Sequence, residues 1–224
     1  GQALDVIRGY VCEGFFTQED VDHMKANLDK DDPNFVPNHT FGEIKAGDLK
    51  YKDINGDGKI DSNDQQVMGK YGWSATPFFY GVNFTLNWKQ FTLFIAGTGQ
   101  MGAKAFKSND WIYNQKKYTS VVRGRWTPET AATATYPRLT AKDNTNNFRN
   151  SNFWLYSTDR FNLNKVQLTY DMPKEWFENK VVKGMSVYVL GESLLTISKH
   201  RKYMETSYGS PQCRFYNLGL KMMF

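Results

Sequence analysis

Residues 214–224 read R-F-Y-N-L-G-L-K-M-M-F, and this stretch decides the fold. Every second residue counted back from Phe224 is apolar, whereas the positions between them include Asn217, Gly219 and Lys221. A period of two over this length predicts a β-strand with one apolar face. A tilted strand of about 9–11 residues is also long enough to cross a bilayer. The stretch therefore predicts a membrane-crossing strand that ends on an aromatic residue.

The clearest hairpin covers residues 80–100. Apolar side chains alternate with Asn and Thr on its first arm and with Thr on its second arm. Lys89 and Gln90 lie between the arms as a two-residue turn, the commonest kind of hairpin connection. Weaker period-two segments at 185–195 and 4–12 predict two further strands.

A break in the alternation marks the predicted strand at residues 161–170. Phe161 and Leu163 are out of phase with Val166 and with the apolar residues that follow it. One extra residue in a strand shifts the phase in this way without ending the strand. We therefore predict a β-bulge near Lys165.

The connections between the predicted strands alternate between short and long. Residues 89–90 and 171–184 form short connections, whereas 13–77, 101–160 and 196–213 form long ones. Bacterial outer-membrane barrels have short periplasmic turns and long extracellular loops. The predicted fold is therefore all-β: strands of a large transmembrane β-barrel with long extracellular loops. A soluble β-sandwich shows similar alternation within its strands, but it has no reason to alternate its connections.

The composition narrows the class of protein. The 224 residues contain no run of eighteen or more apolar residues, which argues against a transmembrane helix. The net charge is +5, but Lys and Arg are scattered and form no recognisable nucleic-acid module, so no nucleic-acid partner is expected. Cys12 and Cys213 fit no metal pattern, and whether they pair is left open. Because the chain begins at Gly1 without a leader, we interpret it as processed or partial.

An acidic loop at residues 53–64 reads D-I-N-G-D-G-K-I-D-S-N-D. It matches the pattern of a calcium-binding loop, in which hard oxygen ligands at alternate positions wrap the cation and Gly58 provides the sharp turn. Asp64 stands where an EF-hand has Glu, as in dockerin-type loops. The competing interpretation is an Asx-rich turn without a metal. The predicted calcium ligands are the side chains of Asp53, Asn55, Asp57, Asp61 and Asp64 and the backbone carbonyl of Lys59.

Five segments in series resemble one family, the SusC/RagA class of TonB-dependent outer-membrane transporters. The likeness extends over nearly the whole chain, and the segments occur in the order found in that family. They are the calcium-type loop within residues 47–64, R-W-T-P-E with Y-P-R-L-T at 125–129 and 136–140, R-F-N-L-N-K-V-Q-L-T-Y-D-M-P at 160–173, V-Y-V-L-G-E-S-L-L-T at 187–196, and the closing strand.

This resemblance implies a barrel of about 22 strands, of which residues 1–224 form the C-terminal part, without the plug domain. It implies a nutrient importer in contact with outer-membrane lipid in the cell outer membrane of a Gram-negative bacterium. The expected substrates are oligosaccharides or peptides. The expected partners are a SusD-like lipoprotein and TonB, the latter reached through an N-terminal part outside this chain.

The residue roles that we predict beyond the calcium loop are of three kinds. The aromatic residues Trp111, Tyr113, Trp126 and Trp154 lie in the long connection at 101–160, where they contact substrate or the lid that the SusD-like lipoprotein forms in this family, or simply pack the loop. Phe224 is the expected barrel-assembly terminus. Polar residues at alternate strand positions line the passage or form a solvated wall; they are Asn83, Asn87, Asn217 and Lys221.

Two other functions compete with the importer. A secreted, calcium-stabilised β-sandwich that binds glycan is the alternative. An enzyme is not expected, because His23, His39 and His200 are the only histidines and none lies in a metal or triad motif. Asp20 and His23 are better explained by a short helix that begins after Thr17, with Asp20 completing a capping arrangement.

Overall fold

The computed structural model describes residues 3–71, 76–107, 120–140, 144–178, 181–202 and 213–224. Over these residues the chain consists mostly of β-strands with few helices, which confirms the predicted all-β class. None of the helices in these ranges is long and apolar enough to cross a membrane. The chain divides into two compact units: a first unit of Gly1–Tyr71 and Lys104–Tyr156, and a second of Gly72–Ala103 and Ser157–Phe224.

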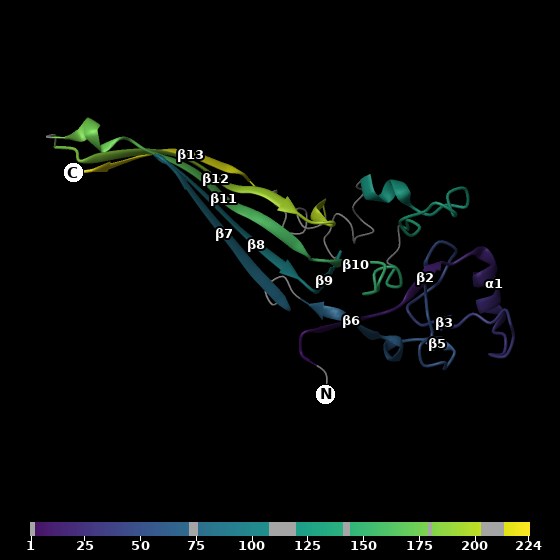
Figure 1. Cartoon of the computed structure of the whole chain (residues 1–224). Helices are drawn as coiled ribbons and strands as arrows, with labels where there is room; N and C mark the ends of the chain where they lie inside the picture. The colour runs from purple at the N-terminus through teal and green to yellow at the C-terminus, as the bar shows by residue number, and fades with distance from the viewer. Residues whose placement is uncertain (1–2, 72–75, 108–119, 141–143, 179–180, 203–212) are drawn as a thin grey trace. The chain divides into compact units, whose positions relative to one another are not determined.

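The second unit is built on one antiparallel sheet of five long strands (Figure 1). Hydrogen-bonded neighbours follow the order β13-β12-β11-β8-β7. The strands are β7 (Phe78–Trp88), β8 (Phe91–Met101), β11 (Arg160–Asp171), β12 (Gly184–Ile197) and β13 (Phe215–Met223). The predicted hairpin, the strand at 161–170 and the strands at 185–195 and 214–224 are therefore confirmed, each to within a few residues.

The turn between β7 and β8 is the predicted two-residue connection. Trp88 pairs with Phe91 across it, and Lys89 has a positive φ of 51°. A left-handed conformation is typical of the two-residue turns whose twist matches that of the flanking strands. The ring planes of Trp88 and Phe91 are nearly parallel, with centroids 6.3 Å apart.

A double bulge interrupts the pairing of β11 with β12. Leu163 pairs with Leu195, but the next pair is Lys165 with Glu192, so β11 has one extra residue and β12 has two. The extra residue in β11 is Asn164, one position from the predicted bulge near Lys165, and the prediction is confirmed. The bulge places Phe161 and Leu163 on the same face as Val166, although they are out of phase in the sequence.

The register separates the side chains into two chemically distinct faces, because directly paired residues share a face and neighbours in a strand alternate. We call them the apolar face and the polar face. The apolar face contains Tyr80, Val82, Phe84, Leu86, Trp88, Phe91, Leu93, Ile95, Phe161, Leu163, Val166, Leu168, Tyr170, Met185, Val187, Val189, Leu195, Ile197, Tyr216, Leu218, Leu220 and Met222. The polar face contains Asn83, Thr85, Asn87, Thr92, Thr98, Asn162, Lys165, Gln167, Thr169, Ser186, Glu192, Thr196, Asn217 and Lys221, with a few apolar residues such as Phe94.

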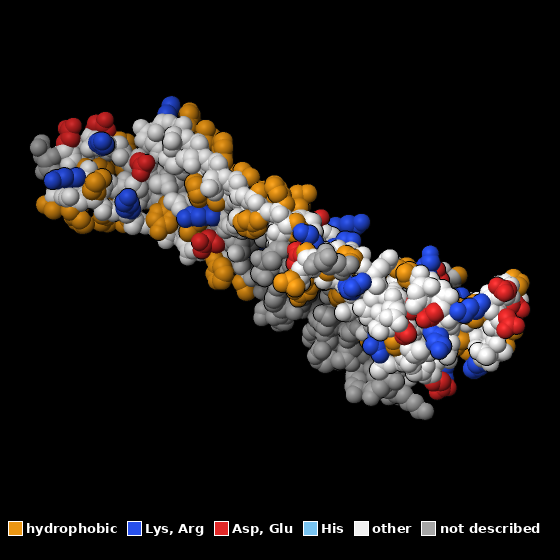
Figure 2. All heavy atoms as spheres, turned by 90° about the horizontal axis from the view of Figure 1, so that it is seen from below, with side chains coloured by type: hydrophobic (Ala, Val, Ile, Leu, Met, Phe, Trp, Pro, Cys, Tyr) orange, Lys and Arg blue, Asp and Glu red, His pale blue; other side chains and the backbone are white. Residues whose placement is uncertain are grey.

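The apolar face is exposed. Val82 is 52% exposed, Val189 54% and Leu218 78%, and hydrophobic side chains cover much of the surface of this sheet in Figure 2. Among the described residues, every large buried apolar side chain lies in the first unit. The five-stranded sheet therefore has no packed core of its own.

Tyrosine rings cover two glycines of this sheet. A Cβ atom on Gly99 would lie 2.1 Å from the ring of Tyr80, and one on Gly219 would lie 2.1 Å from the ring of Tyr188. Each tyrosine is directly paired with its glycine across neighbouring strands. The missing side chain of the glycine provides the space that the ring occupies.

The first unit contains short strands and the α-helix. A four-stranded sheet has the order β1 (Val6–Gly9), β6 (Gln66–Tyr71), β9 (Ala103–Phe106) and β10 (Leu155–Ser157). All of its residues except Ala103 and Ser157 belong to the first unit. Two strand pairs accompany it: β2 (Cys12–Phe15) with β4 (Leu49–Tyr51), and β3 (Asn38–His39) with β5 (Lys59–Ile60). Three short 3-10 helices complete the described elements: η1 (Ser62–Asp64), η2 (Ser120–Gly124) and η3 (Lys174–Phe177), the last of which belongs to the second unit.

Two expectations about this part of the chain need correction. The predicted strand at 4–12 is instead the two strands β1 and β2, which belong to different sheets. The connections at 13–77 and 101–160 are not simple loops, because they fold into strands and a helix with buried residues. Strands of two to six residues are too short to show a period in the sequence, which is why they were missed.

The helix α1 (Gln18–Ala26) begins as the sequence predicts. The Thr17 hydroxyl accepts the backbone N–H of Asp20 at 3.0 Å, and the Asp20 carboxylate accepts the backbone N–H of Thr17 at 3.0 Å. This reciprocal capping satisfies two N–H groups at the start of the helix. A small buried cluster holds the helix in place; it consists of Phe16, Val21, Val36 and Ile44, with Met24 against it.

Candidate functional site

The acidic loop at 53–64 is organised around the carboxylate of Asp53. Its two oxygens accept the backbone N–H groups of Gly56 at 2.7 Å and Gly58 at 2.8 Å. Both glycines have positive φ angles, 72° and 84°, which side-chain-bearing residues rarely adopt. The chain therefore turns sharply around the first predicted ligand.

The next two predicted ligands make shorter-range turns. The Asn55 side-chain oxygen accepts the backbone N–H of Asp57 at 2.9 Å, and the Asp57 carboxylate accepts that of Lys59 at 2.8 Å. Each is a polar side chain bonded to the backbone two residues further on, an Asx-turn. The predicted ligands Asp53, Asn55 and Asp57 therefore lie along one continuously turning segment of backbone.

Asp64 closes the loop. Its side chain is fully buried, and its two oxygens accept the backbone N–H groups of Ile54 at 2.9 Å and Asp61 at 2.8 Å. Asp61 in turn accepts the backbone N–H of Asn63 at 2.7 Å. Asp64, the last predicted ligand, thus accepts a hydrogen bond from Ile54, the residue that follows the first predicted ligand Asp53, and this contact joins the two ends of the loop.

The backbone carbonyl of Lys59 is directed away from the neighbouring strand β3. Asn38 donates its N–H to the carbonyl of Gly58 at 3.1 Å, and Thr40 donates to that of Ile60 at 3.3 Å. Carbonyls alternate in direction along a strand. The Lys59 carbonyl therefore lies on the side opposite to β3.

The donor set fits a hard divalent cation, because it consists of carboxylate, amide and carbonyl oxygens in the required order. The side chains are not gathered tightly, however: in the described ranges no three His, Cys, Asp or Glu side chains lie close enough together to hold a metal ion. Each carboxylate oxygen that accepts one N–H keeps a further lone pair for a cation.

His39 is buried beside this loop, in strand β3. Its Nε2 lies 3.0 Å from the backbone nitrogen of Tyr51 and accepts that N–H, while Nδ1 lies 3.1 Å from the carbonyl oxygen of Pro37. The Phe16 ring meets it edge-on at 4.8 Å between centroids. Burial lowers the pKa of His39 to about 4, and the charge of Lys50 acts in the same direction. These contacts give the histidine a structural role as a neutral ring.

A buried carboxylate, Asp48, connects distant parts of the first unit. Arg138 faces it with an Nη2–Oδ2 distance of 3.0 Å and an Nε–Oδ1 distance of 2.7 Å. Asn144 and Asn147 donate their side-chain N–H groups to it at 2.9 and 2.8 Å, and Lys45 donates its backbone N–H at 2.8 Å. Sequence reasoning missed this hub, since its side-chain partners lie ninety or more residues away.

The predicted aromatic site residues do not share one environment. Trp111 and Tyr113 lie outside the described residues. Trp154 is 2% exposed, and its Nε1 donates to the carbonyl of Asn147 at 2.8 Å, so it is a core residue of the first unit. Trp126 is half-buried and lines an open hollow of about 700 Å³ together with Phe15.

The other predicted residues are placed as follows. Asn83, Asn87, Asn217 and Lys221 all lie on the polar face of the five-stranded sheet. Phe224 follows β13 and is 73% exposed. Neither Cys12 nor Cys213, both described, forms a disulfide.

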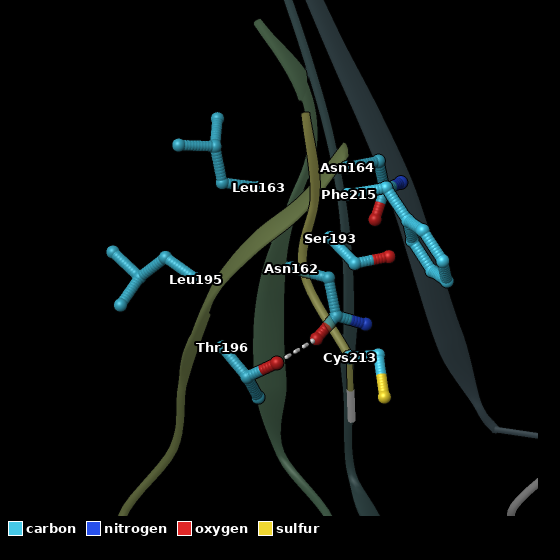
Figure 3. A pocket seen from close by; sticks show the side chains of 8 residues that line it. All are labelled: Asn162, Leu163, Asn164, Ser193, Leu195, Thr196, Cys213 and Phe215. Carbon is cyan, nitrogen blue, oxygen red and sulfur yellow. Dashed lines mark hydrogen bonds between the residues drawn. The ribbon is translucent and has the colours of Figure 1, made fainter. Parts of the chain in front are cut away.

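Sequence reasoning missed a hollow of about 320 Å³ on the second unit, at the double bulge (Figure 3). Asn162, Asn164 and Ser193 contribute to its lining. The break in alternation near Lys165 was the available signal, because bulges redirect side chains. The break alone did not indicate which side chains come together.

Comparisons with known proteins find TonB-dependent receptors among the relatives of this chain. The TonB-dependent receptor P26 of Formosa agariphila is 31% identical over 161 residues, which are 70% of this chain and 16% of that protein. The TonB-dependent receptor P3 of the same organism is 22% identical over 245 aligned residues, covering 100% of this chain and 22% of that protein. No protein-family model matches the chain.

Solved structures show the same fold. A chain of the RagAB peptide importer in its open-open state matches 97% of this chain and 22% of its own length, with a TM-score of 0.64 and 15% identity. The closed-closed state matches 88% of this chain and 20% of its own length, with a TM-score of 0.54 and 16% identity. The resemblance to part of a SusC/RagA-type TonB-dependent transporter is thereby confirmed. The chain spans about a fifth of the length of these relatives.

Proposed function

We propose that this chain forms part of the barrel wall and outer loops of a TonB-dependent nutrient importer in the outer membrane of a Gram-negative bacterium. Its relatives are named TonB-dependent receptors, and its fold matches part of a peptide importer. The proposed substrates are oligosaccharides or peptides. The proposed partners are a SusD-like lipoprotein at the outer loops and TonB, which would act on a part of the protein outside this chain.

The exposed apolar face is the observation that best supports a place in the membrane. The five strands contain 11, 11, 12, 14 and 9 residues, and a tilted strand needs about 9–11 residues to cross a bilayer. Exposing so many large apolar side chains to water would be unfavourable, since each costs about 1.5–3 kcal/mol relative to burial. In the proposed barrel of about 22 strands, the apolar face contacts lipid and the polar face lines the interior.

Uptake measurements test this function directly. Deleting the gene for the full-length protein should abolish uptake of at least one labelled oligosaccharide or peptide mixture, and a TonB deletion should do the same. Re-expression should restore uptake only where TonB is present. Unchanged uptake of every mixture in the deletion strain would refute the importer.

The loop at 53–64 is proposed to bind one structural calcium ion. Its ligands would be the side chains of Asp53, Asn55, Asp57, Asp61 and Asp64 and the carbonyl of Lys59. The ordered oxygens, the direction of the Lys59 carbonyl and the burial of Asp64 support this proposal. The ion would stiffen the first unit beside β3 and β5 and would take no part in chemistry.

Proteolysis of the full-length protein tests the calcium proposal. Adding a chelator should speed cleavage within the first unit, and Asp57→Ala should produce the fast rate even with calcium present. Asp57 is the suitable position because its side chain is exposed and supports only local turns. Asp31→Ala, at an exposed acidic residue outside the loop, is the matched control. If the chelator leaves cleavage of the wild-type first unit unchanged, the loop holds no structural metal.

A further inference from the structure

The double bulge of β11 and β12 forms a notch in the polar face of the sheet. Asn162 and Thr196 are directly paired beside it, and the extra residues Asn164 and Ser193 lie at the point where the pairing is interrupted. Figure 3 shows the side chains of Asn162, Asn164 and Ser193 on one side of the sheet, while Leu163 and Leu195 point to the other. We call this hollow the bulge notch; it is lined by Asn162, Leu163, Asn164, Ser193, Leu195, Thr196, Cys213 and Phe215.

The backbone of β12 is held in an unusual conformation here. Ser193 has a φ of 54°, which residues other than glycine seldom adopt. Strained conformations of this kind cluster at ligand sites and switch regions, and bulges next to such sites often redirect side chains. Ser193 is exposed in the notch.

Hydrogen bonds fix the two asparagine side chains in complementary orientations. The Thr196 hydroxyl donates to Oδ1 of Asn162 at 2.9 Å, which leaves the two N–H groups of that amide as donors. Asn164 donates through Nδ2 to the Thr98 hydroxyl at 2.8 Å, which leaves its Oδ1 as an acceptor. The notch therefore presents an amide donor and an amide acceptor, and the Ser193 side chain lies on the same side of the sheet.

The remaining chemistry of the notch is neutral. All eight lining residues are uncharged, and Phe215 provides an aromatic wall that is 58% exposed. The volume of about 320 Å³ lies at the small end of the range for ligand sites, roughly 300–1,000 Å³. A site of this size accommodates one ring of a longer molecule.

We propose that the bulge notch is a solute-binding site in the inner wall and that it binds one neutral sugar ring of an oligosaccharide. This inference rests on the importer function, because it requires the polar face to line the passage. A sugar hydroxyl both donates and accepts, which matches the fixed donor of Asn162 and the fixed acceptor of Asn164. The apolar face of a sugar ring packs against an aromatic ring such as Phe215. Charged peptide termini and ionised side chains find no opposite charge in this lining.

The thiol of Cys213 provides a direct probe, since it lines the notch and is exposed. Burial raises the pKa of the Cys12 thiol to about 11, so Cys12 reacts slowly with a maleimide at neutral pH. The experiment uses the purified full-length transporter in detergent, an uncharged maleimide, and mass spectrometry of the peptide that contains Cys213. The ligands are maltohexaose, cellohexaose and xylohexaose, with a Gly-Ser hexapeptide for comparison.

The proposal predicts that at least one oligosaccharide slows labelling of Cys213 and that the hexapeptide does not. At ten times its Kd, a ligand that covers the thiol slows labelling about tenfold, following 1 + [L]/Kd. Asn164→Leu and Asn162→Ala should each abolish this protection relative to their own unprotected rates. Asn83→Leu, a change on the same polar face but in β7, should retain it.

Three results would overturn the proposal: no protection by any of the oligosaccharides, protection by the hexapeptide alone, or protection that persists in both asparagine variants. Heat-modifiable migration of each variant on a gel shows whether its barrel has folded. Absence of protection with normal TonB-dependent uptake refutes the notch and leaves the importer intact. Unchanged uptake in the deletion strain would refute the importer itself, so the two failures are distinguishable.

Discussion

At the scale of single residues, the first unit depends on a few buried polar groups that are hydrogen-bonded on more than one side. His39 and Asp48 are the clearest cases, being 4% and 0% exposed. Neither could be assigned its role from the sequence, where His39 belongs to no motif and Asp48 looks like one more acidic residue near the calcium-type loop. The side-chain partners of Asp48 are defined only by the fold, because Arg138 and Asn147 are far away in the sequence. The partners of His39, Pro37 and Tyr51, are close in the sequence, but no local pattern marks them.

The neutral state of His39 makes the first unit sensitive to acid. The folded pKa of about 4 lies below the ordinary value of 6.5, so the unfolded chain binds the extra proton first. The contribution to stability is therefore fully present above pH 6.5 and is lost as the pH falls toward 4; it amounts to roughly 3 kcal/mol. Hydrogen exchange of the Tyr51 amide, which donates to His39, should show this loss in the opening free energy. A His39→Gln variant should lack the pH dependence between 6.5 and 4, and an equal dependence in that variant would assign it to another group.

The Asp48 hub should be among the most sensitive positions of the first unit. Asp48→Asn leaves the Arg138 guanidinium, which is 19% exposed, without its carboxylate and should destabilise the unit by about 3–5 kcal/mol. Faster limited proteolysis of the first unit would reveal the loss. Glu43→Gln is the matched control, because its pair with Lys45 is exposed and should contribute less than about 1 kcal/mol. Equal proteolysis of the two variants would show that the hub is not structural.

At the scale of elements, the sequence predicts the long strands well and the short ones poorly. Strands β7, β8, β12 and β13 have 9–14 residues, enough for a period of two to be recognised. The bulge in β11 was also predictable, because the residues on either side of it are strongly apolar and change phase. The strands of the first unit have two to six residues, and side chains such as Asn146 hold them: its Nδ2 donates to the Leu49 carbonyl at 2.8 Å. No local pattern encodes such a contact.

Neighbouring positions in β11 should respond oppositely to the same substitution. Leu168 lies on the apolar face and Gln167 on the polar face, near the middle of the sheet. Leu168→Lys should place a charge in lipid at a cost of about 2–4 kcal/mol, whereas Gln167→Lys should be tolerated. Outer-membrane abundance and heat-modifiable migration of the full-length variants measure this difference. Equal loss in both variants, or in neither, would count against a lipid-facing apolar face.

At the scale of the whole molecule, the proposed function makes the five-stranded sheet one segment of a larger barrel. Among the described strands, β7 and β13 each have a neighbour on one side only, and long unpaired edges favour association with further strands. The relatives are about five times as long as the part that this chain matches, which leaves ample chain for the rest of a barrel. The first unit, with its calcium-type loop, would then be an ordered outer part of such a receptor.

The most direct test of this account is the lipid exposure of β11 in the full-length protein. Spin labels placed singly at positions 166, 167, 168 and 169 in a reconstituted bilayer report whether each is accessible to oxygen in lipid or to a water-soluble nickel complex. We expect labels replacing Val166 and Leu168 to be accessible to oxygen, and labels replacing Gln167 and Thr169 to be accessible to nickel. Accessibility to nickel at all four positions, without alternation, would contradict a membrane-spanning wall.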